Sequence, residues 1–253
     1  MTTTLKELVS FSNRYLGIDK IKDYCPNGLQ VEGCQHITKI VGGVTASQAL
    51  IDVAIENGAS AILVHHGYFW KGESAEITGI KRNRLKSLLE NDISLIAYHL
   101  PLDVHSVVGN NAQLAQLLDF EIVGPLDPTS KPSIGQVGKL KQAMSAEALR
   151  SLISRRLNRE CLNIGVPDKM VSTIGFCTGA AQGMIEQAVS MNLDAYLSGE
   201  ISEPTVHISR ETGVNYFSAG HHATERGGVK AFGAVLEQNF DIDFQFIDID
   251  NPI

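Results

Sequence analysis

Residues 42–67, GGVTASQALIDVAIENGASAILVHHG, contain the patterns of a strand, a helix and a second strand in that order. The first strand is expected over 37–44 and the helix over 47–57, with Gly58 directly after its last residue. The second strand, 61–64, is a run of four apolar residues, which is typical of a buried strand. A strand, a helix and a strand in succession indicate an α/β fold.

The same alternation continues along the chain. Helices are predicted over 5–16, 82–90 and 110–118, and a strand is predicted over 94–98. The chain has 253 residues, of which 43% are hydrophobic and 19% are charged, so it can form one large domain or two smaller ones.

The second half of the chain repeats this order. Residues 175–200, GFCTGAAQGMIEQAVSMNLDAYLSGE, align with 42–67, and residues 214–225 align with 93–103. We therefore predict an internal duplication, with a first α/β repeat at 1–127 and a second at 128–253, joined near a segment rich in Pro and Ser. Two similar three-layer α/β subdomains would bring the carboxyl ends of their strands to a cleft between them, where we expect the site.

Histidines and carboxylates gather where the predicted strands end. VHHG ends the strand at 61–64, HLPLDVH follows the strand at 94–98, and GHHATE follows the matching strand of the second half. These motifs hold six of the eight histidines and two carboxylates: His65, His66, His99, His105, His221, His222, Asp103 and Glu225. Imidazole and carboxylate together suit divalent transition metals such as zinc, iron, manganese or nickel.

The spacing of these residues suits two metal ions. His65 and His66 are neighbours whose side chains are expected to diverge, so that each reaches a different ion. Asp103 has two oxygens that suit a bridging position, and His221 and Glu225 share one face if their segment is helical. Simpler interpretations stay open: a hydrogen-bonded loop for the histidine pair, a turn for Asp103, and placement near a helix start for Glu225.

Three aromatic residues, Tyr68, Phe69 and Trp70, follow the histidine pair directly. Exposed rings at this place would stack a base or another flat substrate. Burial of the rings between the two halves, or between subunits, explains the same residues equally well.

Composition limits the classes of partner. The net charge of −7 argues against non-specific binding to nucleic acid, and two basic groups, at 81–86 and 155–159, are interpreted as solvated helix faces. No apolar run of about 18 residues occurs, so we expect no membrane span. The four cysteines are scattered, and we expect reduced thiols of a cytoplasmic protein that lie outside the metal site.

Five ordered motifs carry a resemblance that covers nearly the whole chain: YCPNGLQVEG, VHHGYFWKGE, HLPLDVH, GNNAQLA and SAGHHATERGG. The sequence resembles the NIF-three-like (YbgI) family, whose members are catalogued as GTP cyclohydrolase 1 type 2 homologues. It is similar to the short bacterial form, because no large insertion separates the halves. The resemblance implies two intertwined α/β domains, a dinuclear metal site in a cleft, and a toroidal homohexamer. By motif, it assigns the ligands to His65, His66, Asp103, His221 and Glu225, which all match.

The motifs and the resemblance together predict a metal-dependent hydrolase that acts on a nucleotide or a related ring compound, with two divalent ions as cofactors. Glu225 or Asp103 would also handle the proton, and His99, His105 and His222 would orient the ligands or exchange protons. A metal-binding scaffold without catalysis is the alternative. A protein that encircles nucleic acid is a third possibility, against which the net charge counts.

Overall fold

The computed structural model describes residues 3–253, and the chain divides into two compact units. Unit 1 contains the residues up to Val108 together with Gly228–Asp250, and unit 2 contains Gly109–Gly227 together with Asn251–Ile253. Unit 1 is therefore discontinuous in the sequence. Helix α9 (His221–Asn239) begins in unit 2 and continues into unit 1.

Unit 1 is built on a five-stranded sheet with the strand order β13-β4-β5-β6-β2. Strands β4, β5 and β6 are parallel to one another, β13 is parallel to β4, and β2 is antiparallel to β6. A separate pair, β1 and β3, is antiparallel. The bounds in unit 1 are β1 Thr3–Thr4, α1 Leu5–Leu16, a 3-10 helix Ile18–Lys20, β2 Gly28–Val31, β3 His36–Ile37, β4 Lys39–Thr45, α2 Gln48–Glu56, β5 Ala61–His66, α3 Gly79–Glu90, β6 Ser94–Ala97, α4 Leu100–Val104 and β13 Asp243–Phe246.

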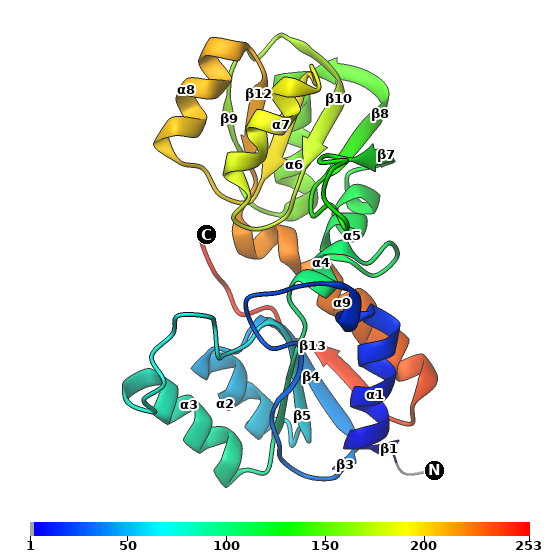
Figure 1. The fold of residues 1–253 in the computed structure, drawn as a ribbon, viewed down its shortest axis with the longest axis vertical. Helices are drawn as coiled ribbons and strands as arrows, with labels where there is room; N and C mark the ends of the chain where they lie inside the picture. Colours follow the sequence, from blue (N-terminus) through cyan, green and yellow to red (C-terminus); the bar gives the residue numbers. More distant parts are fainter. Residues whose placement is uncertain (1–2) are drawn as a thin grey trace. The chain divides into compact units, whose positions relative to one another are not determined.

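Both faces of this sheet are covered by helices, which explains the continuous apolar run of β5. Ile62 and Val64 pack in a core cluster with residues of α2 and α3. Ala61 and Leu63 pack in a second cluster with residues of α1 and α9. Figure 1 shows α2 and α3 on one side of the sheet and α1 and α9 on the other. Unit 1 thus has three layers, as parallel sheets with crossover helices require.

Local signals in the sequence define the helix ends. Thr4 caps α1 in a capping box, in which its side chain accepts from the backbone N–H of Glu7 and the Glu7 carboxylate accepts from Thr4 N. The Ser47 side chain caps α2 by accepting from Leu50 N at 3.2 Å. Gly58 follows α2 with φ +64°, a left-handed conformation that glycine adopts without strain. The predicted helices at 5–16 and 47–57 are confirmed to within a residue at each end.

Unit 2 is built on a six-stranded sheet with the order β7-β8-β10-β11-β12-β9. Strands β10, β11 and β12 are parallel, whereas β7, β8 and β9 pair in antiparallel fashion. The bounds in unit 2 are α5 Asn110–Leu117, β7 Phe120–Pro125, β8 Gln136–Ser145, α6 Ala146–Leu157, β9 Leu162–Ile164, β10 Met170–Phe176, a 3-10 helix Gln182–Met184, α7 Ile185–Ser190, β11 Ala195–Ser198, α8 Glu203–Thr212 and β12 Asn215–Ser218.

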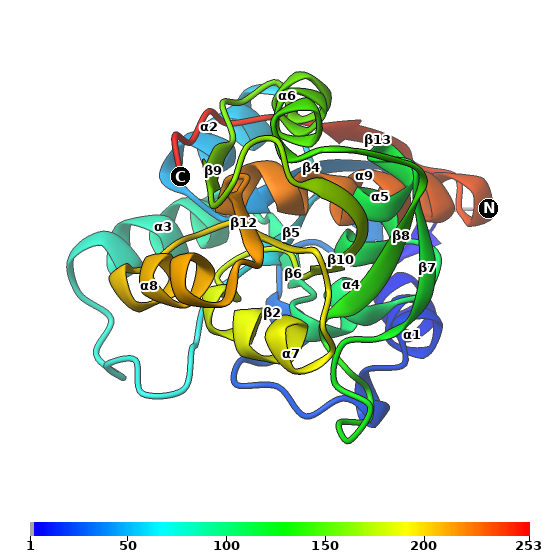
Figure 2. The ribbon, with the colours of Figure 1, turned by 90° about the horizontal axis from the view of Figure 1, so that it is seen from above.

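The sheet of unit 2 also lies between helices. One face packs in a core cluster with α5 and α6, and the other face packs with α7 and α8. Figure 2 shows α6 on one side of these strands and α7 and α8 on the other. Both units are therefore mixed α/β layers, and the predicted α/β class is confirmed, whereas the internal duplication stays a prediction.

The two units share one order of elements. Unit 1 contains the run α1-β2-β4-α2-β5-α3-β6 and unit 2 contains the run α6-β9-β10-α7-β11-α8-β12, when the pair β1–β3 and the short 3-10 helices are set aside; the elements outside these runs are α4, α5, α9, β7, β8 and β13. In both sheets three neighbouring parallel strands follow chain order, β4-β5-β6 and β10-β11-β12, and an antiparallel strand lies beside the last of them; β13 adds a fourth parallel strand in unit 1. Within residues 3–253, the helices are all too short or too polar to cross a membrane.

Candidate metal centre

His65 and His66 are the last two residues of β5, at its carboxyl end. The pairing of β5 with β6 ends at Val64, whereas the pairing with β4 continues to His66. The ring centroids of the two histidines are 4.5 Å apart, so the predicted divergence of the side chains is wrong.

Each ring is held through Nδ1 by a different neighbouring strand. His65 Nδ1 donates to the carbonyl oxygen of Tyr98, directly after β6, at 2.9 Å. His66 Nδ1 lies 3.1 Å from Thr45 Oγ1, at the end of β4. Because a carbonyl oxygen only accepts, Nδ1 of His65 carries a proton, and in the neutral imidazole Nε2 keeps its lone pair. This is the tautomer in which an imidazole binds a metal ion through Nε2.

Asp103 lies in α4, the short helix that follows β6. Its Oδ1 is 3.5 Å from His65 Nε2, and both side chains are buried. Two ligands that are each about 2.1 Å from one tetrahedral ion are about 3.4 Å apart. The distance between the two atoms therefore fits two ligands of a single ion.

His99 is the third imidazole of unit 1, and ligand nitrogens of His65, His66 and His99 lie within 4.8 Å of one another. Its Nδ1 donates to Asp23 Oδ1 at 3.0 Å. Burial alone would raise the pKa of Asp23, but hydrogen bonds from His99 and Asn27 and the nearby imidazole hold it well below its ordinary value. Asp23 thus orients His99. The sequence pattern did not single out Asp23, because it lies in a loop with no periodic signal.

Cys25 lies closer to this cluster than the sequence suggested. One ligand atom each of Asp23, Cys25 and His99 lie within 4.8 Å of one another. Burial, with the negative charges of Asp23 and Asp103, raises the pKa of the Cys25 thiol to about 12. In the metal-free chain Cys25 is therefore a neutral thiol at pH 7.

His221 is the first residue of α9, and Glu225 lies four residues further along the helix, also in unit 2. Their Nε2 and Oε2 atoms are 3.2 Å apart, and Glu225 is buried. The spacing of four residues places both side chains on one helix face, as the sequence predicted. This separation again fits two ligands of one ion.

Glu200 orients His221 from the other side of the ring. Its Oε1 lies 2.7 Å from His221 Nδ1, two residues after the end of β11. Burial would lower the pKa of His221, but hydrogen bonds and charge from Glu225 and Glu200 raise it to about 9. Sequence reasoning missed Glu200. A signal was present, because LSGE aligns with the strand end that carries VHHG and therefore places Glu200 after the matching strand of the second half.

Two glycines leave the space that these side chains fill. A Cβ on Gly179 would lie 2.2 Å from Glu225 Oε1 and 3.2 Å from His221 Nε2, and its φ is +69°. A Cβ on Gly199 would lie 2.6 Å from the Cα of His221. Only glycine fits at both positions, so the backbone forms a close wall around the ligand pair.

The structure places the other predicted histidines outside these hydrogen-bonded pairs. Nδ1 of His105 accepts from the backbone N–H groups of Val107 and Val108, and its ring stacks on Tyr15 at 5.0 Å. Burial lowers the pKa of His105 below its ordinary value. His222 is buried next to His221 on α9, and its backbone N–H donates to the carbonyl of Ile253. The proton-exchange roles of both side chains stay predictions.

The three aromatic residues after β5 have different surroundings. Tyr68 is buried, and its hydroxyl donates to the carbonyl of Ala46 at 2.7 Å, so we leave it out of the proposed substrate contacts. Phe69 is 37% exposed and lies under the ammonium of Lys81. Trp70 packs against His99, with ring centroids 5.0 Å apart.

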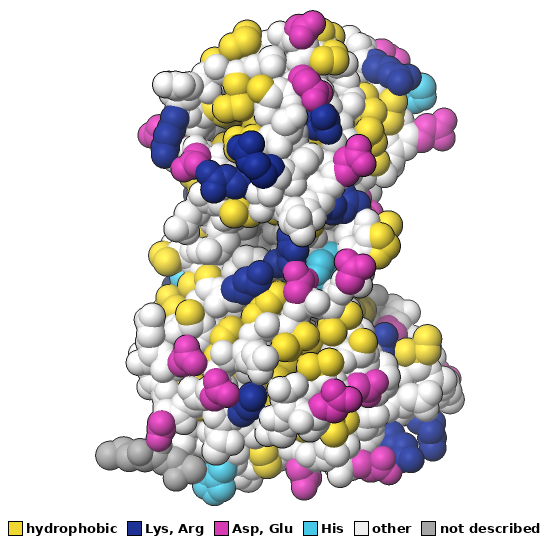
Figure 3. Space-filling view, turned by 180° about the vertical axis from the view of Figure 1, so that it is seen from behind, with side chains coloured by type: hydrophobic (Ala, Val, Ile, Leu, Met, Phe, Trp, Pro, Cys, Tyr) yellow, Lys and Arg dark blue, Asp and Glu magenta, His cyan; other side chains and the backbone are white. Residues whose placement is uncertain are grey.

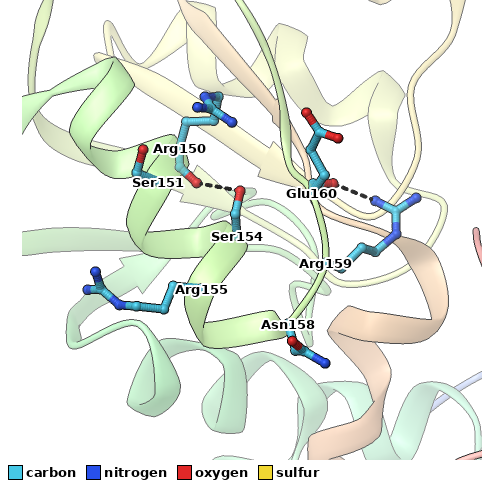
Figure 4. A pocket seen from close by; sticks show the side chains of 7 residues that line it. All are labelled: Arg150, Ser151, Ser154, Arg155, Asn158, Arg159 and Glu160. Atoms are coloured by element: carbon cyan, nitrogen blue, oxygen red, sulfur yellow. Dashed lines mark hydrogen bonds between the residues drawn. The ribbon is translucent and has the colours of Figure 1, made fainter.

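An open depression on unit 2 has no part in either cluster. Its lining comes from α6 and the turn after it: Arg150, Ser151, Ser154, Arg155, Asn158, Arg159 and Glu160 (Figure 4). Arg150 pairs with Glu147 at 2.6 Å, and Arg159 donates to the carbonyls of Glu160 and Pro252. Figure 3 shows the dark blue side chains on this face of unit 2. We assign no function to the depression, because its charges are engaged with neighbours and with solvent.

Known proteins are similar to this chain over nearly its whole length. A sequence profile described as Duf34/NIF3 (NGG1p interacting factor 3) matches residues 3–252. The chain belongs to the Duf34/NIF3 family. A Pseudomonas aeruginosa protein named GTP cyclohydrolase 1 type 2 homolog is 52% identical over 252 residues, which are 100% of both chains.

Solved structures of similar proteins agree with the fold. The structure of protein ybgI, which is described as of unknown function, has a TM-score of 0.95 at 49% identity, covering 99% of this chain and 100% of that one. TTHA1606 from Thermus thermophilus has a TM-score of 0.89 at 31% identity, with 99% and 100% coverage. The resemblance to the NIF-three-like family is therefore confirmed over nearly the whole length of this chain.

Proposed function

We propose that the two clusters, His65, His66 and Asp103 in unit 1 and His221 and Glu225 in unit 2, together form a dinuclear metal site of a hydrolase. The substrate would be a nucleotide or a related ring compound. One observation carries the proposal: in each cluster an imidazole holds a protein acceptor through Nδ1 and places Nε2 3.2–3.5 Å from a carboxylate oxygen. The relatives' name, GTP cyclohydrolase 1 type 2 homolog, supports the choice of substrate class.

The donor set fits divalent transition metals. It consists of imidazole nitrogens and carboxylate oxygens, which zinc, iron, manganese and nickel all accept. Two carboxylates among five ligands offset part of the charge of two divalent ions, and the remaining positions would be open to substrate and water. When bound, two such ions polarise a substrate oxygen and ease the deprotonation of water.

Side chains of the protein itself would accept protons and orient the imidazole rings. Asp103 and Glu225 each have one carboxylate oxygen beside an imidazole nitrogen, and as carboxylates they would accept a proton during the reaction. Asp23 and Glu200 hold the rings of His99 and His221 in place. Gly179 and Gly199 admit the backbone close to the reacting groups.

Metal content and turnover test the proposal. Purified protein should contain two divalent ions per chain, and His65→Ala and Glu225→Gln should each lower that number. His36→Ala and Glu203→Gln are matched controls on exposed side chains and should keep the metal. Full metal content in His65→Ala or Glu225→Gln would show that the ligands are misassigned.

A screen of GTP, other nucleotides and phosphoesters then tests the reaction. Turnover by the metal-loaded protein, lost in both ligand variants, supports the hydrolase. If the variants lose metal but the native protein turns over no substrate, the hydrolase proposal is refuted. A metal-binding scaffold is then the function that remains.

Three broader expectations belong with this proposal. The shared order of elements supports an origin of the units by duplication of one α/β repeat, with the repeats meeting near 127 and 128. Family membership supports a toroidal homohexamer, which light scattering would detect as a mass about six times 27.4 kDa. We place this protein in the cytoplasm, which cell fractionation would test.

A further inference from the structure

A group of aromatic rings surrounds His99 in unit 1. The ring centroid of His99 is 5.0 Å from that of Trp70 and 5.0 Å from that of Tyr24, and both pairs are edge-on. Tyr24 and Trp70 also contact each other, at 5.7 Å. Trp70 reaches the proposed ligand His66 at 6.1 Å. Tyr24 is 52% exposed, so the group presents an aromatic face to solvent.

The backbone holds the two outer rings in place. Phe69 has φ +65°, a conformation that bulky residues rarely adopt, and this turn carries the chain from β5 to Trp70. Trp70 N donates to the Glu73 carboxylate at 3.0 Å, and Lys71 N donates to the carbonyl of Tyr24 at 2.8 Å. Strained backbone that is fixed by several contacts is typical of binding and catalytic sites.

The negative charge next to these rings, on the carboxylate of Asp23, is buried. The side chain of Asp23 is 3% exposed and accepts from His99 Nδ1, Asn27 Nδ2 and Leu100 N. The carboxylate is occupied by these hydrogen bonds and does not face a ligand. The group is therefore unlike an aromatic cage that binds a cation, which uses exposed negative charge and ring faces together.

The spacing of the rings decides how a ligand would bind. A flat ring held between two others needs about 7 Å between them, because each carbon contact takes about 3.5 Å. The 5.7 Å between Tyr24 and Trp70 is too short for this. A ligand ring would therefore stack on an outer face of the pair.

We propose that Tyr24 and Trp70, supported by His99, form a stacking platform for the flat heteroaromatic ring of the substrate beside His65 and His66. The assignment of the ring to a substrate rests on the proposed function. The platform recognises the π-face of the ring, so it accepts different bases and contributes little to the binding of a sugar or a phosphate.

Trp70 is the only tryptophan of the chain, so its fluorescence reports on the platform directly. Full-length protein, freed of metal by a chelator, is titrated with guanosine, uridine, ribose 5-phosphate and choline. Both nucleosides should quench the fluorescence in a saturable way, and ribose 5-phosphate and choline should not. Equal quenching by ribose 5-phosphate, or quenching by choline alone, would overturn the platform.

Variants of Tyr24 sharpen the test. Because loss of one stacking partner costs about 1–3 kcal/mol in other proteins, Tyr24→Leu should weaken guanosine binding about 5- to 150-fold. Tyr24→Phe keeps the ring and should restore binding to near the native value. Native affinity in Tyr24→Leu would refute the inference.

The two proposals fail separately. Tyr24→Leu should keep its metal content, so loss of the platform with metal retained leaves the metal site intact. If the native protein binds no divalent metal at all but guanosine still quenches Trp70, the metal-dependent hydrolase is refuted and the platform stands.

Discussion

Removal of Glu200 should weaken metal binding without unfolding the protein. Its carboxylate lies 2.7 Å from His221 Nδ1 and is 34% exposed, so truncation leaves neither a buried charge nor a large cavity. Partners that orient a ligating imidazole typically contribute 10- to 100-fold to metal affinity. Glu200→Ala should therefore raise the dissociation constant by about that factor, which is about 1.4–2.7 kcal/mol.

The series of variants makes the reasoning testable. Glu200→Gln retains an acceptor for His221 Nδ1 but loses the charge, so its affinity should lie between those of the native protein and Glu200→Ala. Competition with a chromophoric chelator, using manganese or zinc at pH 7.5, measures all three. Glu203→Ala is the matched control, because it removes an exposed carboxylate from the start of α8. Native affinity in Glu200→Ala, or an equal loss in Glu203→Ala, would refute the orienting role.

Three further predictions concern stability and the glycine wall. The pKa of His221 is raised to about 9, so its protonated form stabilises the metal-free fold fully below pH 6.5. This contribution, up to about 3 kcal/mol, is lost as the pH rises through 9. The urea midpoints of the native protein and His221→Gln should therefore differ at pH 6 and converge at pH 10. Gly179→Ala and Gly213→Ala both place a side chain at positive φ and should each lose about 1–2 kcal/mol of unfolding free energy. Only Gly179→Ala should also lose metal, since a Cβ on Gly213 meets nothing within 4 Å, and equal metal content in the two would contradict the close wall. Thr4→Ala should cost about 1 kcal/mol by thermal unfolding, because it removes the bond from Glu7 N to the Thr4 side chain at the start of α1, and an unchanged melting temperature would show that the cap is dispensable.

Regular periodicity made much of the fold predictable. Helix α1 begins at Leu5 because Thr4 and Glu7 form a capping box, and that pattern is visible in the sequence. The run Ala61–Val64 is apolar at every position because helices cover both faces of β5. The helical spacing of His221 and Glu225 likewise placed two proposed ligands on one face.

Such patterns do not predict contacts between loops that are distant in the sequence. Asp23 meets His99 across 76 positions of the chain, and neither residue belongs to a periodic segment that would predict the contact. The rings of His65 and His66 converge, whereas strand alternation alone places neighbouring side chains on opposite faces. Tyr68 and Trp70 look alike in sequence, yet the left-handed turn at Phe69 separates a buried ring from a partly exposed one.

The split of unit 1 across the chain has a consequence for synthesis. Ribosomes deliver residues 109–227 before residues 228–250, so all but the last three residues of unit 2 emerge while unit 1 still lacks its last helix and strand. During that interval the face of β5 that carries Ala61 and Leu63 has no cover from Val229, Phe232 and Leu236. The unit that begins first thus receives its last helix and strand only after nearly all of the second unit has been made, which differs from the usual order for successive domains. A nascent chain halted near residue 227 would expose an apolar sheet face, the kind of surface that chaperones bind.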